Sequence, residues 1–293
     1  MDILEDNFYI NGINNTRIHL KKLVPENSKR VFIVFHGICE HSGRYKNFID
    51  YFIKHETTLY LVDHRGHGLS DGTRGYIEDF NYYSSDALEV IKFVNKAEPN
   101  TKFIIAHSLG GLIITYTYLL NKADFKEIKG FVFSAPAYKI KDLPDILEGA
   151  VLSITKIIKN KFFTLPISPS FFLNDPEEIK KYKADPLIVR KINPTLFRES
   201  LKAIHFCEEH IKKMEKPLLV LIGGKDAVVG QENILNLYQH MSSLDKEKII
   251  YPNSFHELFN DLYRNNVFLD IDSWTEKRTI TKSFWSKLNP FSK

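Results

Sequence analysis

The 293-residue sequence predicts an α/β fold built on a doubly wound, mostly parallel sheet. Several short runs, such as residues 30–35 and 57–62, are apolar throughout, as strands are when helices cover both faces of their sheet. Between these runs lie segments whose apolar residues recur with helical spacing. The two kinds of segment alternate with short connections, which requires right-handed crossovers and therefore parallel neighbouring strands.

The first half of the chain supplies these elements in order. Residues 8–10 and 16–24 flank the turn-rich segment NGINN, and the second arm alternates apolar with charged residues, which is typical of a hairpin at a sheet edge. Further strands are predicted at residues 30–35, 57–62, 103–106 and 129–134. Helices are predicted at residues 45–55, 82–97 and 109–120.

The alternation stops between residues 137 and 214, where we expect three or four helices broken at prolines. It returns with strands at 216–222 and 247–251, a helix at 232–241 and a long terminal helix at about 266–288. Residues 1–136 and 215–293 should therefore form one core, and residues 137–214 a helical cap inserted after the sixth strand. The loops at the carboxyl ends of the strands should form the functional site.

Composition narrows the classes of function. The net charge of +4 is small and the lysines are scattered among acids, so the chain is not expected to bind nucleic acid. The two cysteines, Cys39 and Cys207, lack the spacing of metal ligands and should be free thiols in a reducing, cytoplasmic compartment. The acidic amino terminus lacks the pattern of a signal peptide, and no membrane span is expected.

Ser108 is the candidate nucleophile. It follows a buried run and precedes the helix that begins at Leu109, so it should lie on a sharp strand-to-helix turn. Such a turn holds the serine in strained backbone geometry and needs small residues on either side. Ala106 and Gly110 fill these places, which gives AxSxG where GxSxG is usual. An ordinary strand end can also match five residues of this kind, so the rest of the chain decides the assignment.

A serine hydroxyl becomes a nucleophile when an imidazole takes its proton and a carboxylate orients that imidazole. Asp226 lies in the loop GGKDAVV and His256 in the loop PNSFHELFND, each after a predicted strand. The order serine, acid, histidine is the order that this architecture uses. A turn-forming aspartate and a surface-loop histidine are the alternative interpretations, and Asp261 is the fallback acid.

Attack on an ester creates a negative oxygen, which needs two backbone N–H donors. The amide of Leu109 is one candidate, because it starts the helix after the serine and the helix dipole favours an anion there. The amide of Ile38 is the other, because His36 and Gly37 end a strand and let the backbone turn toward the site. This chemistry requires no metal and no cofactor.

On these motifs the chain resembles the monoacylglycerol lipase and lysophospholipase branch of the α/β-hydrolases. The resemblance implies an α/β-hydrolase fold with a helical cap, a triad of Ser108, Asp226 and His256, and oxyanion donors at Ile38 and Leu109. It covers most of the chain in the family's order. The matching motifs are HGICEHSGRY (36–45), DHRGHGLSDG (63–72), AHSLGG (106–111), DPL (185–187), GGKDAVV (223–229) and FHELFND (255–261).

The resemblance also implies a polar subsite for the glycerol end of a substrate. In monoacylglycerol lipases an arginine of the loop after the third strand holds this end, together with a glutamate and a tyrosine one helical turn apart on the cap. Arg44, Glu178 and Tyr182 match those places. Alternatively, Arg44 pairs with a nearby acid, and Glu178 and Tyr182 form an exposed helix face.

Three residues depart from the family pattern. Ala106 replaces the elbow glycine, and Cys39 replaces a glycine beside the predicted oxyanion loop, where bulky thiol reagents should then slow turnover. Phe259 stands where relatives with a glycerol site often carry a second histidine. This last change weakens the case for a monoglyceride and favours a lysophospholipid or a simple carboxylic ester.

Residues 142–163 of the cap carry two adjoining apolar stripes with three lysines near the end. This pattern fits a helix packed on the core, or a lid that rests on a bilayer, which we favour because an acyl chain must leave a membrane or micelle. The basic, aromatic tail KSFWSKLNPFSK adds a second membrane contact, or is the frayed end of a docked helix.

The sequence therefore predicts a cytoplasmic serine hydrolase, in transient contact with membrane surfaces, that cleaves carboxylic esters of single-chain lipids through an acyl-enzyme. A short-chain carboxylesterase of the same fold is the first alternative. A non-catalytic binding protein of this fold is the second, although such proteins usually lose a triad member. A peptidase of the same superfamily is a remoter alternative, because an amine leaving group needs protonation and usually an acidic anchor for the substrate amino terminus. Dehalogenases and epoxide hydrolases are disfavoured, because they carry an aspartate at the position of Ser108. No oligomeric state is predicted.

Overall fold

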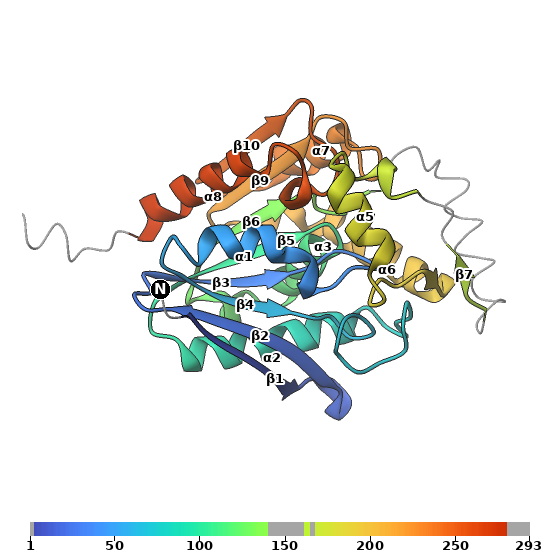
Figure 1. The fold of residues 1–293 in the computed structure, drawn as a ribbon, viewed down its shortest axis with the longest axis horizontal. Coiled ribbons are helices and arrows are strands. Elements are labelled where there is room, and N and C mark those ends of the chain that lie inside the picture. Colours follow the sequence, from blue (N-terminus) through green and yellow to red (C-terminus); the bar gives the residue numbers. More distant parts are fainter. Residues whose placement is uncertain (1–2, 140–160, 165–167, 280–293) are drawn as a thin grey trace, which may run out of the picture.

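Eight strands form one sheet through the middle of the protein, with helices on both faces (Figure 1). The structure is a computed structural model and describes residues 3–139, 161–164 and 168–279. The strand order is β1-β2-β4-β3-β5-β6-β9-β10, with β2 antiparallel to both of its neighbours and all other pairs parallel. The strands are β1 (Ile3–Asn11), β2 (Arg17–Pro25), β3 (Arg30–Phe35), β4 (Thr57–Val62), β5 (Thr101–His107), β6 (Ile128–Ser134), β9 (Leu218–Gly223) and β10 (Lys246–Tyr251).

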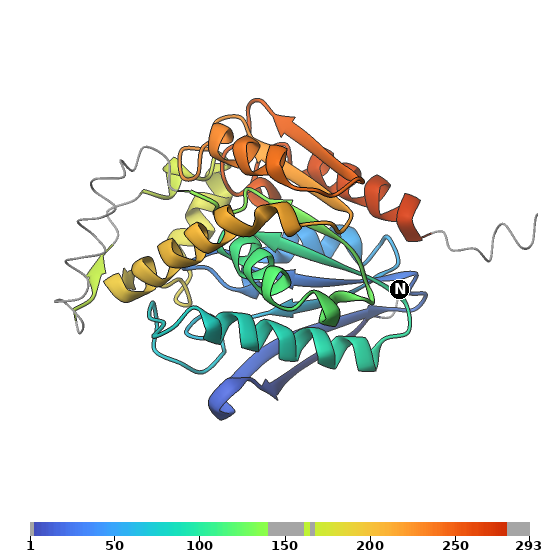
Figure 2. The same cartoon turned by 180° about the vertical axis from the view of Figure 1, so that it is seen from behind.

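Two groups of helices cover the two faces of the sheet, which Figures 1 and 2 show from opposite sides. The first group is α2, α3, α6 and α7, and the second is α1 and α8; each group shares an apolar core with the sheet. Because both faces are covered, β3, β4 and β9 are buried at every position. The helices are α1 (Lys46–Phe52), α2 (Asn81–Ala97), α3 (Leu109–Leu120), α5 (Pro176–Ala184), α6 (Pro194–His210), α7 (Gln231–His240) and α8 (Arg264–Thr279).

α3 is apolar around its circumference and buried along most of its length, which requires a cover on its outer side. α6 supplies this cover: Leu201, Ile204 and Cys207 share the core with α3. The rings of Tyr116 and Phe206 lie 4.8 Å apart between the two helices. The last helix of the predicted cap is therefore also part of the helical layer over the sheet, and the division of the chain at residues 136 and 215 stays a proposal.

The predicted α/β architecture is confirmed, and most predicted elements agree with the observed ones to within a few residues. The helix predicted at 45–55 was wrong at both ends, because a 3₁₀ turn, η2 (Ser42–Tyr45), precedes it and α1 ends at Phe52. The cap helix predicted at 142–163 was wrong at its end, because Phe163 pairs with Ile192 between β7 (Phe163–Thr164) and β8 (Lys191–Ile192). The rest of that prediction, residues 142–160, lies outside the described residues, as do the terminal helix beyond Thr279 and the tail at 282–293.

The parallel strands β3, β5, β9 and β10 all end at one edge of the sheet. The loops that follow them carry the residues that the sequence analysis assigned to the site. Two short 3₁₀ turns, η4 (Pro169–Phe171) and η6 (Leu258–Asn260), flank a hydrogen bond from Glu257 N to Phe172 O, which joins the cap segment to the loop after β10. This edge is therefore where the site must be sought.

Candidate active site

Ser108 lies between β5 and α3 with φ 49° and ψ −114°, a conformation that costs an L-residue energy. The turn is tight on both sides. A side chain at Gly110 would lie 2.5 Å from the carbonyl oxygen of Phe35 and 2.7 Å from that of His36, so only glycine fits there. Ala106 is fully buried in β5, where its methyl group joins the core. The AxSxG sequence therefore supports the same turn that GxSxG would.

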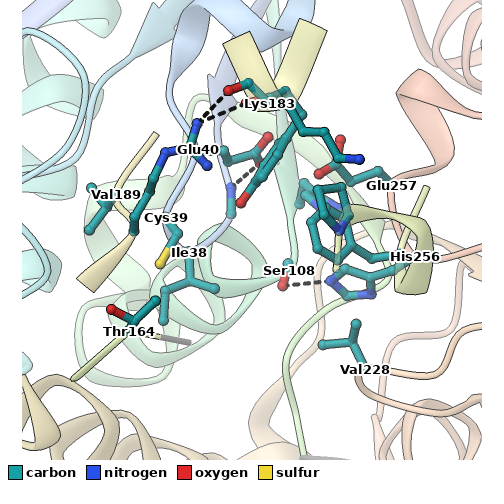
Figure 3. Close-up of a pocket in the computed structure, with 16 residues that line it drawn as sticks. Ile38, Cys39, Glu40, Ser108, Thr164, Lys183, Val189, Val228, His256 and Glu257 are labelled. Carbon is teal, nitrogen blue, oxygen red and sulfur yellow. Dashed lines mark hydrogen bonds between the residues drawn. The ribbon is translucent and has the colours of Figure 1, made fainter. Parts of the chain in front are cut away.

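The structure brings Ser108, His256 and Asp226 together in one hydrogen-bonded chain. His256 Nε2 lies 2.9 Å from Ser108 Oγ (Figure 3), and His256 Nδ1 lies 2.7 Å from Asp226 Oδ2. The other carboxylate oxygen of Asp226 accepts the backbone N–H groups of Val228 and Val229 at 2.8 and 3.0 Å. With Asp226 ionised, Nδ1 donates to the carboxylate and Nε2 accepts the hydroxyl proton of Ser108. This arrangement can move a proton from the serine to the imidazole.

The charges of His256 and Asp226 reinforce each other. Burial alone would raise the pKa of Asp226, but the charge of His256 and its hydrogen bond lower the pKa to about 2. Burial likewise opposes the charged form of His256, yet the charge of Asp226 raises the His256 pKa above its ordinary value. Asp226 is therefore ionised at neutral pH, and His256 is a stronger base than a free imidazole.

Residues 36–41, which we call the HG loop, pass close to Ser108. A side chain at Gly37 would lie 3.2 Å from Ser108 Cβ, so the backbone approaches the serine directly. Ile38 follows, and the backbone N–H groups of Ile38 and Leu109 donate to no other group within the described residues. The side chain of Glu40 accepts the N–H of Gly37 and the hydroxyl of Tyr45, which fixes the loop from inside.

A cavity of about 240 Å³ opens beside Ser108 and His256 (Figure 3). Figure 3 shows Ile38, Thr164 and Val228 on one side of Ser108, and Glu40, Lys183 and Glu257 on the other. The cavity therefore has an apolar end and a charged end, with the serine between them. Its lining residues are Gly37, Ile38, Cys39, Glu40, His107, Ser108, Thr164, Pro169, Phe172, Tyr182, Lys183, Val189, Arg190, Val228, His256 and Glu257.

Comparison with known families and proteins places this site in context. A family model described as "Serine aminopeptidase, S33" matches residues 26–263, well over half of the chain. The chain belongs to this family. The human monoglyceride lipase is 28% identical over 258 residues, which cover 86% of this chain and 84% of that enzyme. A monoacylglycerol lipase of Mycolicibacterium smegmatis is 26% identical over 269 residues, covering 90% and 94% of the two chains.

Solved structures agree on the fold of this S33 family member. A soluble variant of the Saccharomyces cerevisiae monoglyceride lipase, in complex with a substrate analog, superimposes with a TM-score of 0.79 at 18% identity and covers 94% of this chain and 97% of its own. The family resemblance and the α/β-hydrolase fold predicted from the sequence are therefore confirmed. The family match likewise confirms the predicted enzyme class, a serine hydrolase.

The S33 family member brings Arg44, Glu178 and Tyr182 together, but not all at the cavity. Arg44 Nη2 donates to Glu257 Oε2 at 3.1 Å, Arg44 Nη1 lies 3.6 Å from Glu178 Oε2, and the guanidinium lies 5.4 Å from the centre of the Tyr182 ring. Only Tyr182 lines the cavity. The side chains of Arg44 and Glu178 are buried and do not line the cavity. The alternative of an exposed helix face is therefore wrong for Glu178. A direct contact of Arg44 or Glu178 with substrate stays a proposal.

Sequence reasoning missed two acids and two cations at the cavity. Glu40 and Glu257 line it, and both stand inside motifs already singled out, HGICEH and FHEL. Burial, and then the charge of Glu257, raise the pKa of Glu40 to about 8. Lys183, one residue after Tyr182, and Arg190 also line the cavity. Their place in a motif could have indicated Glu40 and Glu257, and adjacency to Tyr182 could have indicated Lys183, but no motif contains Arg190.

Two other residues have structural roles. Asp261 accepts hydrogen bonds from Ser254 Oγ, Phe255 N and Tyr263 N at 2.9 to 3.1 Å, so it shapes the turn after β10 and is not bonded to His256. Phe259 is buried against the rings of Tyr45 and Phe48. It therefore belongs to an apolar cluster in this family member.

Cys39 lines the cavity beside Ile38, with φ 65° and a buried thiol. Burial raises the pKa of this thiol to about 12, so the thiolate that reacts with most reagents is scarce. The effect of bulky thiol reagents on turnover stays a prediction. Within the described residues, no cluster of three or more His, Cys, Asp or Glu could hold a metal ion. In the same part of the chain, no helix has the length and apolar character to cross a bilayer.

Proposed function

We propose that this chain cleaves carboxylic esters of single-chain lipids, in the manner of a monoacylglycerol lipase or lysophospholipase, with Ser108 as nucleophile. The observation that carries the proposal is the continuous chain of hydrogen bonds from Ser108 through His256 to Asp226. It lies beside a cavity with an apolar and a charged end, which suits an amphiphilic ester. The names of the human and mycobacterial relatives point to monoacylglycerols among these substrates.

In the proposed reaction His256 takes the hydroxyl proton as Ser108 Oγ attacks the ester carbonyl carbon. The carbonyl oxygen becomes an anion, which the N–H groups of Ile38 and Leu109 stabilise. When the tetrahedral intermediate collapses, the bond to the alcohol breaks and His256 returns the proton to the departing oxygen. The acyl group stays on Ser108 until water, deprotonated by His256, attacks it and releases the fatty acid.

Exposed aromatic side chains near the cavity support contact with a lipid surface. Phe162, Phe163 and Phe171 are 41%, 47% and 50% exposed. Each lies within two residues of Thr164 or Phe172, which line the cavity. An apolar rim of this kind would let an acyl chain pass from a membrane or micelle into the cavity.

A short-chain carboxylesterase is the second candidate, and the cavity volume of about 240 Å³ favours it. The two candidates differ in the acyl length that gives the highest kcat/KM. A panel of monoacylglycerols, lysophospholipids, triacylglycerols and short p-nitrophenyl esters, tested side by side, separates them. Highest activity on long-chain lipid esters supports the lipase proposal, and highest activity on acetate or butyrate esters supports the alternative.

A fluorophosphonate probe tests the catalytic proposal directly. The probe should label the protein, and Ser108→Ala should abolish both labelling and ester cleavage. Ser243→Ala is a matched control, because Ser243 is buried in a loop that does not line the cavity. Normal turnover by Ser108→Ala, or no labelling of the folded wild type, would refute the assignment and leave the non-catalytic alternative.

A further inference from the structure

Two cations line the same cavity as Ser108, and the proposed chemistry uses neither. Lys183, in the last turn of α5, and Arg190 are both exposed lining residues. Figure 3 shows the Lys183 side chain extending toward the side where Glu257 lies, away from Ile38 and Val228. The charge of Lys183 is therefore at the end of the cavity opposite these apolar side chains, where we place the alcohol part of the substrate, and the Arg190 guanidinium lies beside the Lys183 backbone, 2.8 Å from its carbonyl oxygen.

The acidic groups nearby are already compensated. Glu257 Oε2 accepts from Arg44 at 3.1 Å and from Asn260 Nδ2 at 3.0 Å. Glu178 lies 3.6 Å from Arg44 and accepts from Lys181 Nζ at 2.7 Å. The negative charges of Glu257 and Glu178 are balanced by the positive charges of Arg44 and Lys181. These acids therefore do not cancel the charge of Lys183 and Arg190.

Glu40 is the remaining acid of the cavity, and it is fully enclosed. Its carboxyl group bonds to Gly37 N and Tyr45, and burial with the charge of Glu257 raises its pKa to about 8. It is therefore mostly protonated at neutral pH. The charged end of the cavity then has an excess of positive charge on its exposed side.

Arg190 is held in place by the end of α5. Its Nη2 donates to the carbonyl oxygens of Tyr182, Lys183 and Asp185 at 3.3, 2.8 and 3.3 Å, which caps the helix. Its Nε and Nη1 have no protein partner within the described residues. The cap thus fixes a guanidinium at the cavity wall and leaves two of its nitrogens available to a ligand.

We propose that Lys183 and Arg190 form a subsite for an anionic phosphate on the alcohol side of the substrate, so that the preferred ester is a lysophospholipid with a negatively charged headgroup. The inference rests on the proposed function, because Ser108 must cleave the acyl ester of the same molecule. A glycerol headgroup needs hydroxyl partners and no net charge, whereas a phosphate needs cationic donors of the kind that Lys183 and Arg190 supply.

The test compares two soluble substrates with the same acyl chain, 1-octanoylglycerol and 1-octanoylglycerol 3-phosphate, as monomers at physiological ionic strength. Monomers avoid attraction of the whole protein, which has a net charge of +4, to an anionic surface. We expect kcat/KM of the wild type to be higher for the phosphate ester. In Lys183→Gln the ratio of the two kcat/KM values should fall about fivefold, and further in Lys183→Glu.

Matched variants separate binding from general damage. Lys180→Gln removes the same charge from an exposed position of the same helix that does not line the cavity, and should leave the ratio unchanged. Lys183→Arg should keep most of the preference. A wild type that prefers the neutral ester, or equal ratios in wild type, Lys183→Gln and Lys183→Glu, would overturn the subsite.

Two further measurements distinguish a failure of the phosphate subsite from a failure of the proposed function. If p-nitrophenyl butyrate is cleaved and Ser108→Ala is inactive, the proposed role of Ser108 as nucleophile stands whatever the headgroup preference is. Inorganic phosphate should inhibit that cleavage far less than octanoylglycerol phosphate does. Equal inhibition by both would mean a free-phosphate site and would contradict the headgroup subsite.

Discussion

His41 Nε2 donates to Asp185 Oδ2 over 2.8 Å, which joins the HG loop to the cap segment. The direction is fixed because His41 Nδ1 accepts the N–H of Gly43 at 3.1 Å, so the proton lies on Nε2. A second bond runs parallel to the first, from Val189 N to Cys39 O at 2.9 Å. The position of Ile38 therefore depends on the cap as well as on the sheet.

Breaking this link should lower kcat. In His41→Ala or Asp185→Ala, the HG loop loses one of its attachments and the Ile38 amide moves from its place near Ser108. We expect a decrease in kcat of about tenfold, because part of one oxyanion donor is lost. Steady-state kinetics on a p-nitrophenyl ester measures it, and the double variant should be no worse than either single one. Fully additive effects would show that the two residues act separately.

Replacing Asp226 and replacing Asp261 should have different effects. Asp226→Asn should lower kcat by about 10³- to 10⁴-fold, because the amide cannot stabilise the imidazolium. Asp261→Asn should instead reduce the free energy of unfolding by about 1–3 kcal/mol, because its carboxylate holds the turn after β10. Kinetics and chemical denaturation of both variants check this. A large loss of kcat in folded Asp261→Asn would instead indicate that Asp261 is the catalytic acid.

The pH dependence of kcat/KM should report His256. Activity needs the neutral imidazole, so kcat/KM should rise with pH as His256 loses its proton. Burial opposes its charged form, but the charge of Asp226 raises its pKa, so the midpoint should lie above the ordinary histidine value of about 6.5. Asp226 has a pKa of about 2, so its titration should not change kcat/KM near neutral pH. A pH profile of Asp226→Asn should show a lower midpoint, and an unchanged one would count against the coupling.

Glu40 should make the wild type less stable at high pH. The folded protein holds the Glu40 proton up to a pKa of about 8, against an ordinary value of 4.5. Between these values only the unfolded chain ionises, so the free energy of unfolding falls as pH rises through this window. Glu40→Gln keeps an acceptor for Gly37 N and should remove a loss on the order of 1–3 kcal/mol between pH 5 and 8. Parallel stability profiles for variant and wild type would contradict the prediction.

The sequence was informative where each loop followed a strand with a strong apolar pattern. β4 and α3 were predicted at their observed bounds, because polar or turn-forming residues bound their apolar patterns at both ends. The alternation also predicted that Ser108, Asp226 and His256 belong to loops at one sheet edge. The distances between them depend on packing and could not be predicted.

The sequence was less informative where burial decides the chemistry. Arg44 lies behind Tyr182 because Glu257 and Glu178 hold it there, and no spacing rule relates residues 44, 178 and 257. The altered pKa of Glu40 likewise depends on enclosure by groups from distant segments. In the cap, β7 and β8 have two residues each, which is too short for a periodic signal, so they were not anticipated.

The packing of α6 on α3 limits how this enzyme can be engineered. Leu201, Ile204 and Cys207 seal the outer side of the helix whose first residue follows the serine. A chimera that takes its entire insertion from a relative would leave that helix against a foreign surface. Exchanges of substrate preference between relatives should therefore be confined to the stretch that ends before Pro194, so that the native α6 stays with its partner.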